Sequence, residues 1–403
     1  MKQGWEIKTL GEISQIINGG TPDTTVQKFW DGDNLWITPK DMGKLDGIYV
    51  NDTFRKITDE GIKNSSAKIL PINSIILSSR APIGHLAINK RPISTNQGCK
   101  GLVPKNGVDT LYLYYFLSKS VELLNSLGTG ATFKELSGSK LGTVEIPIPP
   151  LPEQQRIVVI LEEAFAAIAK AKVNAEQNFK NAKELFESYL QQLFEKKGES
   201  WEERTLKEVC AKITDGTHQT PKYYDDGVIF LSSKNVTSGK INWDNIKYID
   251  EIQHIQMHKR VAPRVGDILL AKNGTTGVAA MVDRDVIFDI YVSLAHIRVL
   301  NKVTPEFMLY FINSPVAKKQ FNKRLKGSGV PNLHLEEIRE VVISFPKSTD
   351  EQKTIVKKLD ALSAETKKLE AIYQAIINNL EELKKSILQK AFSGELTKVE
   401  VFA

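Results

Sequence analysis

Two histidines, His254 and His258, have the spacing of a metal-binding pair on a helix. Residues four apart lie on the same helix face, and zinc sites of the HExxH type use this spacing. The glutamate of that motif is absent, because the segment reads HIQMH, and no third ligand is evident. A zinc site needs at least three protein ligands. We therefore expect surface histidines here and predict no metal for this chain.

The sequence lacks the signatures of nucleotide-dependent and methyl-transfer enzymes. It contains no GxxxxGK[ST] loop, no GxSxG nucleophile motif and no [DNS]PP[FYW] motif. Its short glycine loops, GTGATF at 128–133 and GTTG at 274–277, lack the third glycine of a dinucleotide site. We therefore expect a recognition protein that catalyses no reaction and binds no cofactor itself.

Basic residues are densest just before a glycine turn at 327–329, where the sequence places Lys318, Lys319, Lys323, Arg324 and Lys326. Such a cluster suits contacts with phosphates. A solvated helix face explains this feature equally well. The whole chain has 54 Lys plus Arg against 48 Asp plus Glu, a net charge of +6. That balance permits a polyanionic partner without requiring one.

Length and composition bound the class of protein. A chain of 403 residues with 41% hydrophobic and 25% charged residues is typical of a globular protein of several domains. Cys99 and Cys210 are too few for a disulfide scaffold and suit a reducing cytoplasm. Transmembrane helices need about 18 or more apolar residues in a row, and no run reaches that length. We expect a cytoplasmic protein without a membrane partner.

The chain repeats itself once. WEIKTLGEIS at 5–14 returns as WEERTLKEVC at 201–210, and LPEQQRIV at 151–158 returns as TDEQKTIV at 349–356. Between these, further segments recur in the same order: LWITPKDM as IFLSSKNV, NSIILSSRAPIG as GDILLAKNGTTG, and LGTGATFKEL as KGSGVPNLHL. The shared order predicts one duplicated unit, far longer than a solenoid repeat.

Each copy has two parts. The first mixes short β-rich runs with Gly, Pro, Asn and Asp turns and predicts one short helix, at Leu111–Asn125 or Pro305–Leu325. The second is a long helix after a proline-containing break, because proline and acidic residues favour a first helical turn.

Apolar residues recur along both long helices at alternating spacings of four and three, which is the coiled-coil pattern. Small residues in the first helix and large ones in the second predict that the two pack on each other; the alternative is two amphipathic helices packed on separate domains. Asn178 either fixes the register or marks a point where the seam opens. The predicted seam contains Ile157, Leu161, Ile168, Asn178, Leu185, Leu359, Leu362, Leu369, Ile376 and Leu383.

Connectivity predicts an antiparallel pair, because the first helix leaves one globular part and enters the next, whose ends we expect to be close. The predicted fold class is α+β, with two similar globular α/β parts joined and followed by two long helices that form an antiparallel coiled coil. A pseudo-twofold axis follows from the repeat. The predicted bounds are 1–150 and 199–349 for the globular parts, and 151–198 and 350–403 for the helices.

The chain resembles the specificity (S) subunits of type I restriction–modification systems over nearly its whole length. The resemblance rests on the WE–TL–E opening of each copy, the Thr-Pro glycine turns, the segment PLPEQQRI and the closing LQKAFSGEL at 388–396. It implies two target-recognition domains that read the halves of a split, asymmetric sequence in double-stranded DNA. It also implies helices that space these domains and dock two methyltransferase (M) subunits. S-adenosylmethionine, ATP and Mg would belong to the M and restriction (R) subunits.

The resemblance places base readout on loops that enter the major groove, where Arg, Lys, Asn, Gln, Ser and Thr contact base edges. For any one residue, a turn or phosphate role is an equal alternative. In the first copy we favour Thr38, Lys40, Ser79, Arg80, Asn96, Gln97 and Thr132. In the second we favour Ser233, Lys234, Asn235, Lys272, Asn273, Thr275 and Asn332, with Lys323, Arg324 and Lys326 from the basic cluster. The competing hypothesis is a pseudosymmetric coiled-coil scaffold that binds protein or glycan instead of DNA.

Overall fold

The computed structural model describes residues 3–130, 134–196, 198–236, 239–274, 276–325 and 332–397. Thr132, Thr275 and Lys326, which the sequence analysis selects, lie outside these residues. The chain divides into two compact units, Met1–Asn174 with Ile376–Ala403 and Ala175–Ala375. Each unit therefore contains one globular part and a portion of both long helices.

The first unit is built on a five-stranded sheet of order β2-β9-β6-β7-β4 and a three-stranded sheet of order β5-β3-β8. The first sheet comprises β2 (Ser14–Asn18), β4 (Tyr49–Val50), β6 (Ile75–Ser79), β7 (Ile83–Asn89) and β9 (Cys99–Pro104). The second comprises β3 (Trp30–Ile37), β5 (Arg55–Ile57) and β8 (Ile93–Thr95), and a separate pair joins β1 (Glu6–Thr9) to β10 (Glu145–Ile148).

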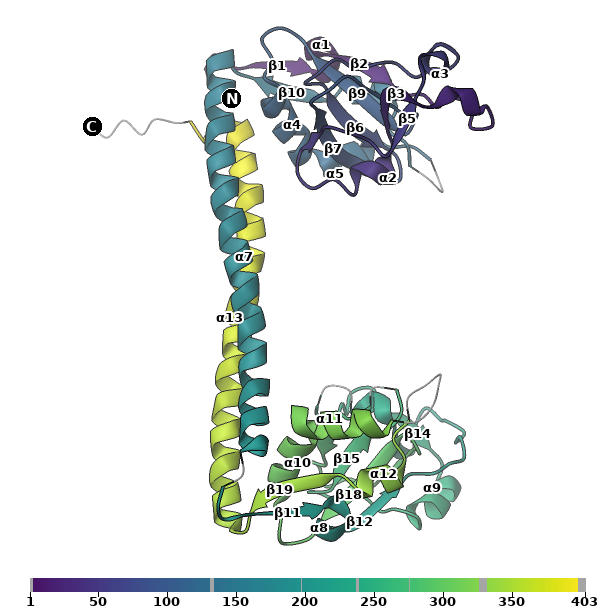
Figure 1. The fold of residues 1–403 in the computed structure, drawn as a ribbon, viewed down its shortest axis with the longest axis vertical. Helices are drawn as coiled ribbons and strands as arrows, with labels where there is room; N and C mark the ends of the chain where they lie inside the picture. The colour runs from purple at the N-terminus through teal and green to yellow at the C-terminus, as the bar shows by residue number, and fades with distance from the viewer. Residues whose placement is uncertain are drawn as a thin grey trace, which may run out of the picture. The chain divides into compact units, whose positions relative to one another are not determined.

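Short helices connect and cover these strands (Figure 1). They are α1 (Leu10–Ile13), η1 (Gln27–Phe29), α2 (Pro39–Met42), α3 (Asp59–Lys63), α4 (Thr110–Lys119), α5 (Val121–Leu127) and α6 (Gly138–Gly142).

The second unit repeats this plan with fewer strands. Its sheets have the orders β12-β18-β15-β16 and β14-β13-β17, and β11 pairs with β19. The strands are β11 (Trp201–Thr205), β12 (Cys210–Asp215), β13 (Val228–Leu231), β14 (Lys247–Ile249), β15 (Ile268–Ala271), β16 (Ala279–Met281), β17 (Phe288–Ile290), β18 (Leu294–Val299) and β19 (Val342–Pro346). The short helices are α8 (Leu206–Val209), η2 (Ser233–Asn235), α9 (Glu251–His258), α10 (Pro305–Asn313), α11 (Pro315–Arg324) and α12 (Leu335–Arg339).

The repeated opening motif has the same structural role in both units. In the first, Thr9 and Glu12 form a capping box at α1, with Glu12 Oε2 accepting from the Thr9 backbone N–H at 2.6 Å. In the second, Glu208 Oε2 accepts from the Thr205 backbone N–H at 2.7 Å at the start of α8. Paired Thr and Glu satisfy free N–H groups of a first turn, so the TLxE pattern fixes where each helix begins.

The helical segment predicted within each globular part is two helices, not one. In the first unit, α4 and α5 meet at Ser120, and in the second, α10 and α11 meet at Ser314. Pro315 follows Ser314 at the first position of α11, where the absent N–H of proline is tolerated only at a new helix start.

The two predicted long helices are α7 (Leu151–Glu195) and α13 (Thr349–Ser393), each of 45 residues. In the first unit, Ile157 and Leu161 near the start of α7 share a core with Leu388 and Phe392 near the end of α13. In the second unit, Phe194 near the end of α7 shares a core with Leu359 near the start of α13. The helices are therefore antiparallel within each unit (Figure 1).

Only half of the ten predicted seam residues lie on the buried face of the long helices. Ile157, Leu161, Ile168 and Leu359 are buried and Leu362 is half-buried. The remaining predicted positions are exposed: Asn178, Leu185, Leu369, Ile376 and Leu383. In α7, Phe165, Phe179 and Phe186 are less exposed than Asn178 and Leu185, one residue to the side. The buried positions of α7 in this stretch are Ala175 and Ala182, with Phe179 and Phe186 half-buried. Asn178 and Leu185 are therefore corrected to the edge of the seam, and Leu369, Ile376 and Leu383 of α13 are likewise more exposed than predicted.

None of the helices in the described residues combines the length and hydropathy that a membrane span requires.

Candidate nucleic-acid interface

The turns after β6 and β15 are equivalent positions in the two units. Strand pairing places Leu77 opposite Lys100 and Leu270 opposite Ala295. Two residues beyond each leucine, a backbone carbonyl accepts a hydrogen bond from a loop that is distant in sequence. The Ser79 carbonyl accepts from the Leu136 backbone N–H, and the Lys272 carbonyl accepts from the Leu333 backbone N–H, both at 2.9 Å. The next residue forms an isolated antiparallel β-bridge through its backbone: Arg80 with Glu135 in the first unit, and Asn273 with Asn332 in the second. The same backbone frame therefore carries Arg and Glu in one unit and two Asn residues in the other.

In the first unit this frame opens into a cleft of about 690 Å³, which we call the first cleft. It is lined by Asn18, Lys100, Thr129, Glu135, Ser137, Gly138 and Ser139. None of these residues is among those predicted from the sequence to contact DNA. They come from β2, β9, the loop between α5 and α6 and the first residues of α6, so sequence proximity gave no signal for the whole cluster.

Glu135 lies between two cations in the first cleft. Its Oε2 lies 3.6 Å from Arg80 Nη1, and its Oε1 lies 3.9 Å from Lys100 Nζ. Burial lowers the pKa of Lys100, and the neighbouring Glu135 partly opposes that shift. The half-exposed Arg80 guanidinium keeps several donors available, because one weak ion pair uses few of its five N–H groups.

The equivalent cleft in the second unit, the second cleft, has a volume of about 790 Å³. Its centre is Asp215, whose Oδ2 lies 3.1 Å from Lys272 Nζ and whose backbone carbonyl accepts from Arg260 Nε at 3.0 Å. Burial by itself would raise the pKa of Asp215, but hydrogen bonds from Arg260 and Lys272 outweigh it and hold that pKa below its usual range. Lys272 is therefore a buried ion-pair partner as well as a lining residue.

Asn273 and Asn332 line the second cleft and carry buried side-chain oxygens that accept no hydrogen bond within the described residues. A buried polar atom without a partner costs about 1–3 kcal/mol. A ligand that donates hydrogen bonds into the second cleft would remove that cost. The two side-chain oxygens are therefore acceptors at this cleft that no described residue satisfies.

The other predicted residues of the first unit lie at the ends of the parallel strands β3 and β8. The Thr38 hydroxyl donates to Asp41 Oδ2 at 2.6 Å and caps α2, so it is engaged within the protein. The Asn96 side chain accepts from the Gly98 backbone N–H at 3.0 Å, and Gln97 accepts from the Thr21 hydroxyl. Ser79 is buried.

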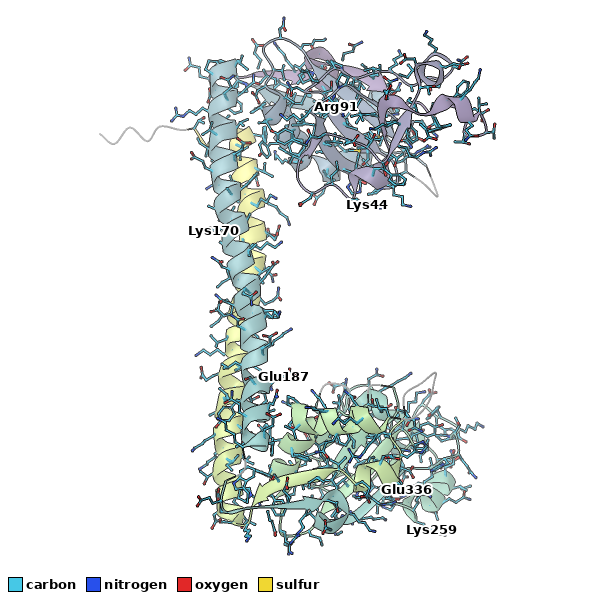
Figure 2. All side chains as sticks on the ribbon, viewed as in Figure 1. Lys44, Arg91, Lys170, Glu187, Lys259 and Glu336 are labelled. Atoms are coloured by element: carbon cyan, nitrogen blue, oxygen red, sulfur yellow. The ribbon has the colours of Figure 1, made fainter. Side chains whose placement is uncertain are left out.

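Lys40 is exposed, as is Gln97. Lys40 lines a hollow of about 590 Å³ together with Lys44, Phe54 and Arg55. Lys44 lies just after α2 at the edge of the first unit (Figure 2). This hollow presents three cations and two carboxylates, Asp41 and Asp52, beside an exposed aromatic ring, so its net positive charge is small.

In the second unit, Ser233, Lys234 and Asn235 form η2 and line a pocket of about 460 Å³ with Tyr223 and Tyr291. Asn235 is structural, because its amide donates to the Asn242 and Asn245 carbonyls and its oxygen accepts from the Ser232 N–H at 2.9 Å. Lys234 is exposed.

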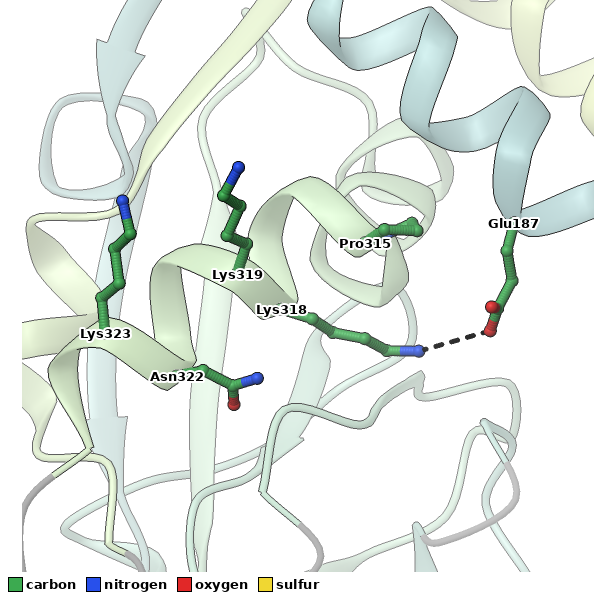
Figure 3. A pocket seen from close by; sticks show the side chains of 6 residues that line it. All are labelled: Glu187, Pro315, Lys318, Lys319, Asn322 and Lys323. Carbon is green, nitrogen blue, oxygen red and sulfur yellow. Dashed lines mark ion pairs between the residues drawn. The ribbon is translucent and has the colours of Figure 1, made fainter. Parts of the chain in front are cut away.

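The lysine side chains of the basic cluster on α11 point in different directions (Figure 3). Lys318 Nζ approaches Glu187 Oε1 of α7 at 4.0 Å, whereas Lys319 and Lys323 are exposed. Arg324 donates to the Gln320 carbonyl at 3.1 Å and to the Glu340 carbonyl at 3.4 Å. Lys319 and Lys323 are therefore the members of this cluster best placed for phosphate contacts.

Comparison with known proteins agrees with this architecture. The family model for the type I restriction modification DNA specificity domain matches residues 2–177 and 198–382. The MjaIX specificity subunit of a type I restriction enzyme from Methanocaldococcus jannaschii is 30% identical, over 97% of this chain and 93% of its own length.

Solved structures show the same fold. A chain from a solved type I R-M system has a TM-score of 0.79 with 18% identity, over 98% of this chain and 99% of that chain. The HsdS subunit from Thermoanaerobacter tengcongensis has a TM-score of 0.64 with 18% identity, over 98% of each chain. The chain therefore belongs to the specificity-subunit family of type I restriction–modification systems, whose members are non-catalytic and bind no cofactor themselves, and its family membership implies DNA target recognition.

Proposed function

We propose that this chain recognises a split, asymmetric DNA sequence and directs M and R subunits to it. Each globular part reads one half-site, residues 1–150 acting as the first target-recognition domain and residues 199–349 as the second. The helices at 151–198 and 350–403 act as the spacer. S-adenosylmethionine is then bound by the M subunits, and ATP and Mg are used by the partner complex rather than by this chain.

The observation that carries this proposal is the difference in chemistry between two equivalent positions. Arg80 and Glu135 occupy the frame that Asn273 and Asn332 occupy in the second unit. Arginine favours the O6 and N7 acceptors of guanine, whereas asparagine favours the N6 and N7 edge of adenine. Equivalent positions with different side chains are expected to read different bases, so the two half-sites differ.

The exposed faces of the long helices support docking of two M subunits. Leu185 and Tyr189 on α7, and Leu369, Ile376 and Leu383 on α13, are large apolar side chains left exposed. Exposed apolar surface of this kind is characteristic of protein–protein contact sites. A pair of related faces fits two copies of one partner.

Methylation mapping tests the proposal. The chain is co-expressed with its M subunit in a host whose DNA lacks other methylation, and modified adenines are mapped by single-molecule sequencing. We expect a motif of two unlike half-sites separated by unread bases. A contiguous or palindromic motif, or no motif at all with a folded and assembled complex, contradicts the proposal.

A further inference from the structure

The second unit contains a three-residue cluster outside both clefts, formed by His254, His258 and Asp289. His254 Nδ1 lies 2.7 Å from Asp289 Oδ2, and His258 Nδ1 lies 3.0 Å from Asp289 Oδ1. One nitrogen or oxygen from each residue lies within 4.8 Å of the others. This corrects the sequence prediction of two surface histidines without a third ligand, because β17 supplies the missing carboxylate from far along the chain.

The local fold holds the two histidines in place. Asp250 begins α9 by accepting from the Gln253 backbone N–H at 2.8 Å, and the helix then runs from Glu251 to His258. Residues four apart share a helix face, so both imidazoles point to the same side. Their ring centroids are 4.7 Å apart. Gln253 anchors the same helix through two hydrogen bonds with the Lys222 backbone.

Asp289 faces the histidines from the interior. It lies in β17, pairs with Phe230 of the parallel strand β13, and its side chain is fully buried. A buried carboxylate needs compensation for its lost hydration. Two other buried carboxylates of this unit each have an arginine, since Asp215 pairs with Arg260 and Asp267 with Arg298. Within the described residues, Asp289 has the two imidazoles as its hydrogen-bonding partners.

We propose that His254, His258 and Asp289 bind one divalent transition-metal ion, of the class of Zn²⁺ or Co²⁺. Two nitrogen donors and one carboxylate suit such ions, whereas Mg²⁺ and Ca²⁺ prefer all-oxygen sites. A cation supplies the positive charge that a neutral imidazole lacks. His258 is about one-third exposed, which leaves a fourth position open to water.

Side-chain rotation is needed to bring the three donors to the spacing that the ion requires. Zn–N and Zn–O bonds of about 2.0–2.1 Å in a tetrahedron put neighbouring donors about 3.3 Å apart. The two distances here, 2.7 Å for His254 and 3.0 Å for His258, run to different oxygens of Asp289, and one donor atom from each residue lies within 4.8 Å of the others. Binding one ion therefore requires rotation of the half-buried His258 ring, so that both ring nitrogens and one carboxylate oxygen reach the tetrahedral spacing.

The metal would act on positioning and not on catalysis. Arg260 follows His258 by two residues and donates to the backbone carbonyl and the carboxylate of Asp215 in the second cleft. Anchoring α9 to β17 through an ion therefore restricts the segment that carries Arg260. This consequence for DNA reading rests on the proposed function, whereas metal binding itself does not.

Cobalt titration of the purified full-length chain, stripped with chelator and free of any histidine tag, tests the proposal. We expect one equivalent of Co²⁺ to bind with the visible absorption of a low-coordinate site, and Zn²⁺ to displace it. His258→Gln and His254→Gln should each weaken binding by at least about tenfold, the scale known for disturbed metal sites. His85→Gln, in the first unit, is the matched control and should bind like wild type.

Circular dichroism establishes that each variant is folded before its affinity is compared. A wild-type chain that binds Co²⁺ and Zn²⁺ no better than a folded His254→Gln/His258→Gln double variant overturns the proposal. In that case the cluster is a hydrogen-bonded triad only. Because these titrations contain no DNA and no M subunit, their outcome is independent of methylation mapping.

Discussion

Gln154 and Gln352 make the same three hydrogen bonds at the start of the two long helices. Gln154 accepts from the Asp109 backbone N–H at 2.9 Å and donates to the carbonyls of Gly107 and Pro149. Gln352 accepts from the Thr304 N–H at 2.8 Å and donates to the carbonyls of Lys302 and Pro346. Asp109 and Thr304 are the N-caps of α4 and α10, so each glutamine joins a long helix to its globular part. This network gives a physical reason for the repeated EQ pair.

Replacement of Gln154 by leucine should destabilise the first unit by about 2–4 kcal/mol, because several buried backbone groups lose their partners together. Gln352→Leu should do the same to the second unit. Hydrogen exchange of peptides from each unit measures the two effects separately. Gln155→Leu, at the exposed neighbouring position, is the matched control. Equal protection in Gln154→Leu and Gln155→Leu chains would show that the network contributes little.

We expect the stability of the second unit to fall in acid because of Asp267. Burial would raise the pKa of Asp267, but hydrogen bonds from Arg298 and His296 outweigh it and hold that pKa well below its usual range. A depressed carboxyl pKa adds stability that is fully present above the unfolded value of about 3.9 and is lost as the pH falls through the folded value. Asp267→Asn should therefore cost about 3–5 kcal/mol at pH 7.

The cost of Asp267→Asn should shrink as the pH is lowered below about 4, since the Asp267 carboxyl of the unfolded chain then begins to protonate while that of the folded chain stays ionised. Urea unfolding of both chains at several pH values, with hydrogen exchange to assign the second unit, measures this. Asp225→Asn, at an exposed position, should be nearly neutral at every pH. A cost for Asp267→Asn that stays constant down to pH 2 would exclude the carboxylate's charge as its source.

Arg80→Ala and Asn273→Ala should each relax a different half-site. Loss of a bidentate base contact costs about 1–3 kcal/mol and affects only the base that it reads. Asn273 is a cleaner choice than Lys272 in the second unit, because Lys272 also pairs with the buried Asp215. Methylation mapping with the M subunit provides the readout. Lys170→Ala, on the exposed face of α7 (Figure 2), is the control for lost positive charge.

Weaker methylation of every sequence by the same factor in Arg80→Ala and Asn273→Ala would identify these residues as phosphate contacts. The proposed split target would survive that result, but the assignment of base-reading residues would not.

Insertion of four helix-forming residues in each long helix should lengthen the unread spacer by one or two base pairs. Four residues add about 6 Å to a helix and are close to one full turn, so the packing face rotates by only about 40°. DNA advances about 3.4 Å per base pair. Suitable positions are between Gln177 and Asn178 in α7 and between Ala375 and Ile376 in α13, close to the boundaries between the units.

The readout of this insertion is again the methylated motif. Unchanged half-sites with a longer spacer are expected. An unchanged spacer in a chain that still assembles and methylates would show that helix length does not measure DNA. The helices would then serve to dock M subunits alone.

The sequence predicts the repeat from segments that recur in order, both long helices from their apolar spacing, and the antiparallel pairing from the connectivity of the chain. It predicts the phase of the seam only in part. Apolar residues occupy two adjacent stripes of α7, one containing Leu185 and the other Phe179 and Phe186. Spacing alone does not choose between two such stripes, and in the structure Phe179 and Phe186 are half-buried whereas Leu185 is exposed.

The polar clusters around Asp215 and Asp289 could not be predicted from the sequence for a different reason. Asp215 meets Arg260 and Lys272, and Asp289 meets two histidines of α9, through contacts between segments far apart in the chain. No local motif contains such pairs. They arise only when strand order brings β12 near β15, and β17 near α9, so the sequence offers the residue types without their partners.

The order of synthesis determines which of the two units can finish folding first. The second unit, Ala175–Ala375, is continuous, whereas the first recruits Phe392 against Tyr112 and Phe116, and Thr397 donates to Glu153 at 2.7 Å. Domains generally fold as their residues emerge. The N-terminal unit is therefore the last to be completed, and a premature stop near the C-terminus damages the core at the opposite end of the sequence. A nascent chain must keep that core open through the synthesis of the whole second unit, which makes chaperone contact during translation most valuable for the N-terminal residues.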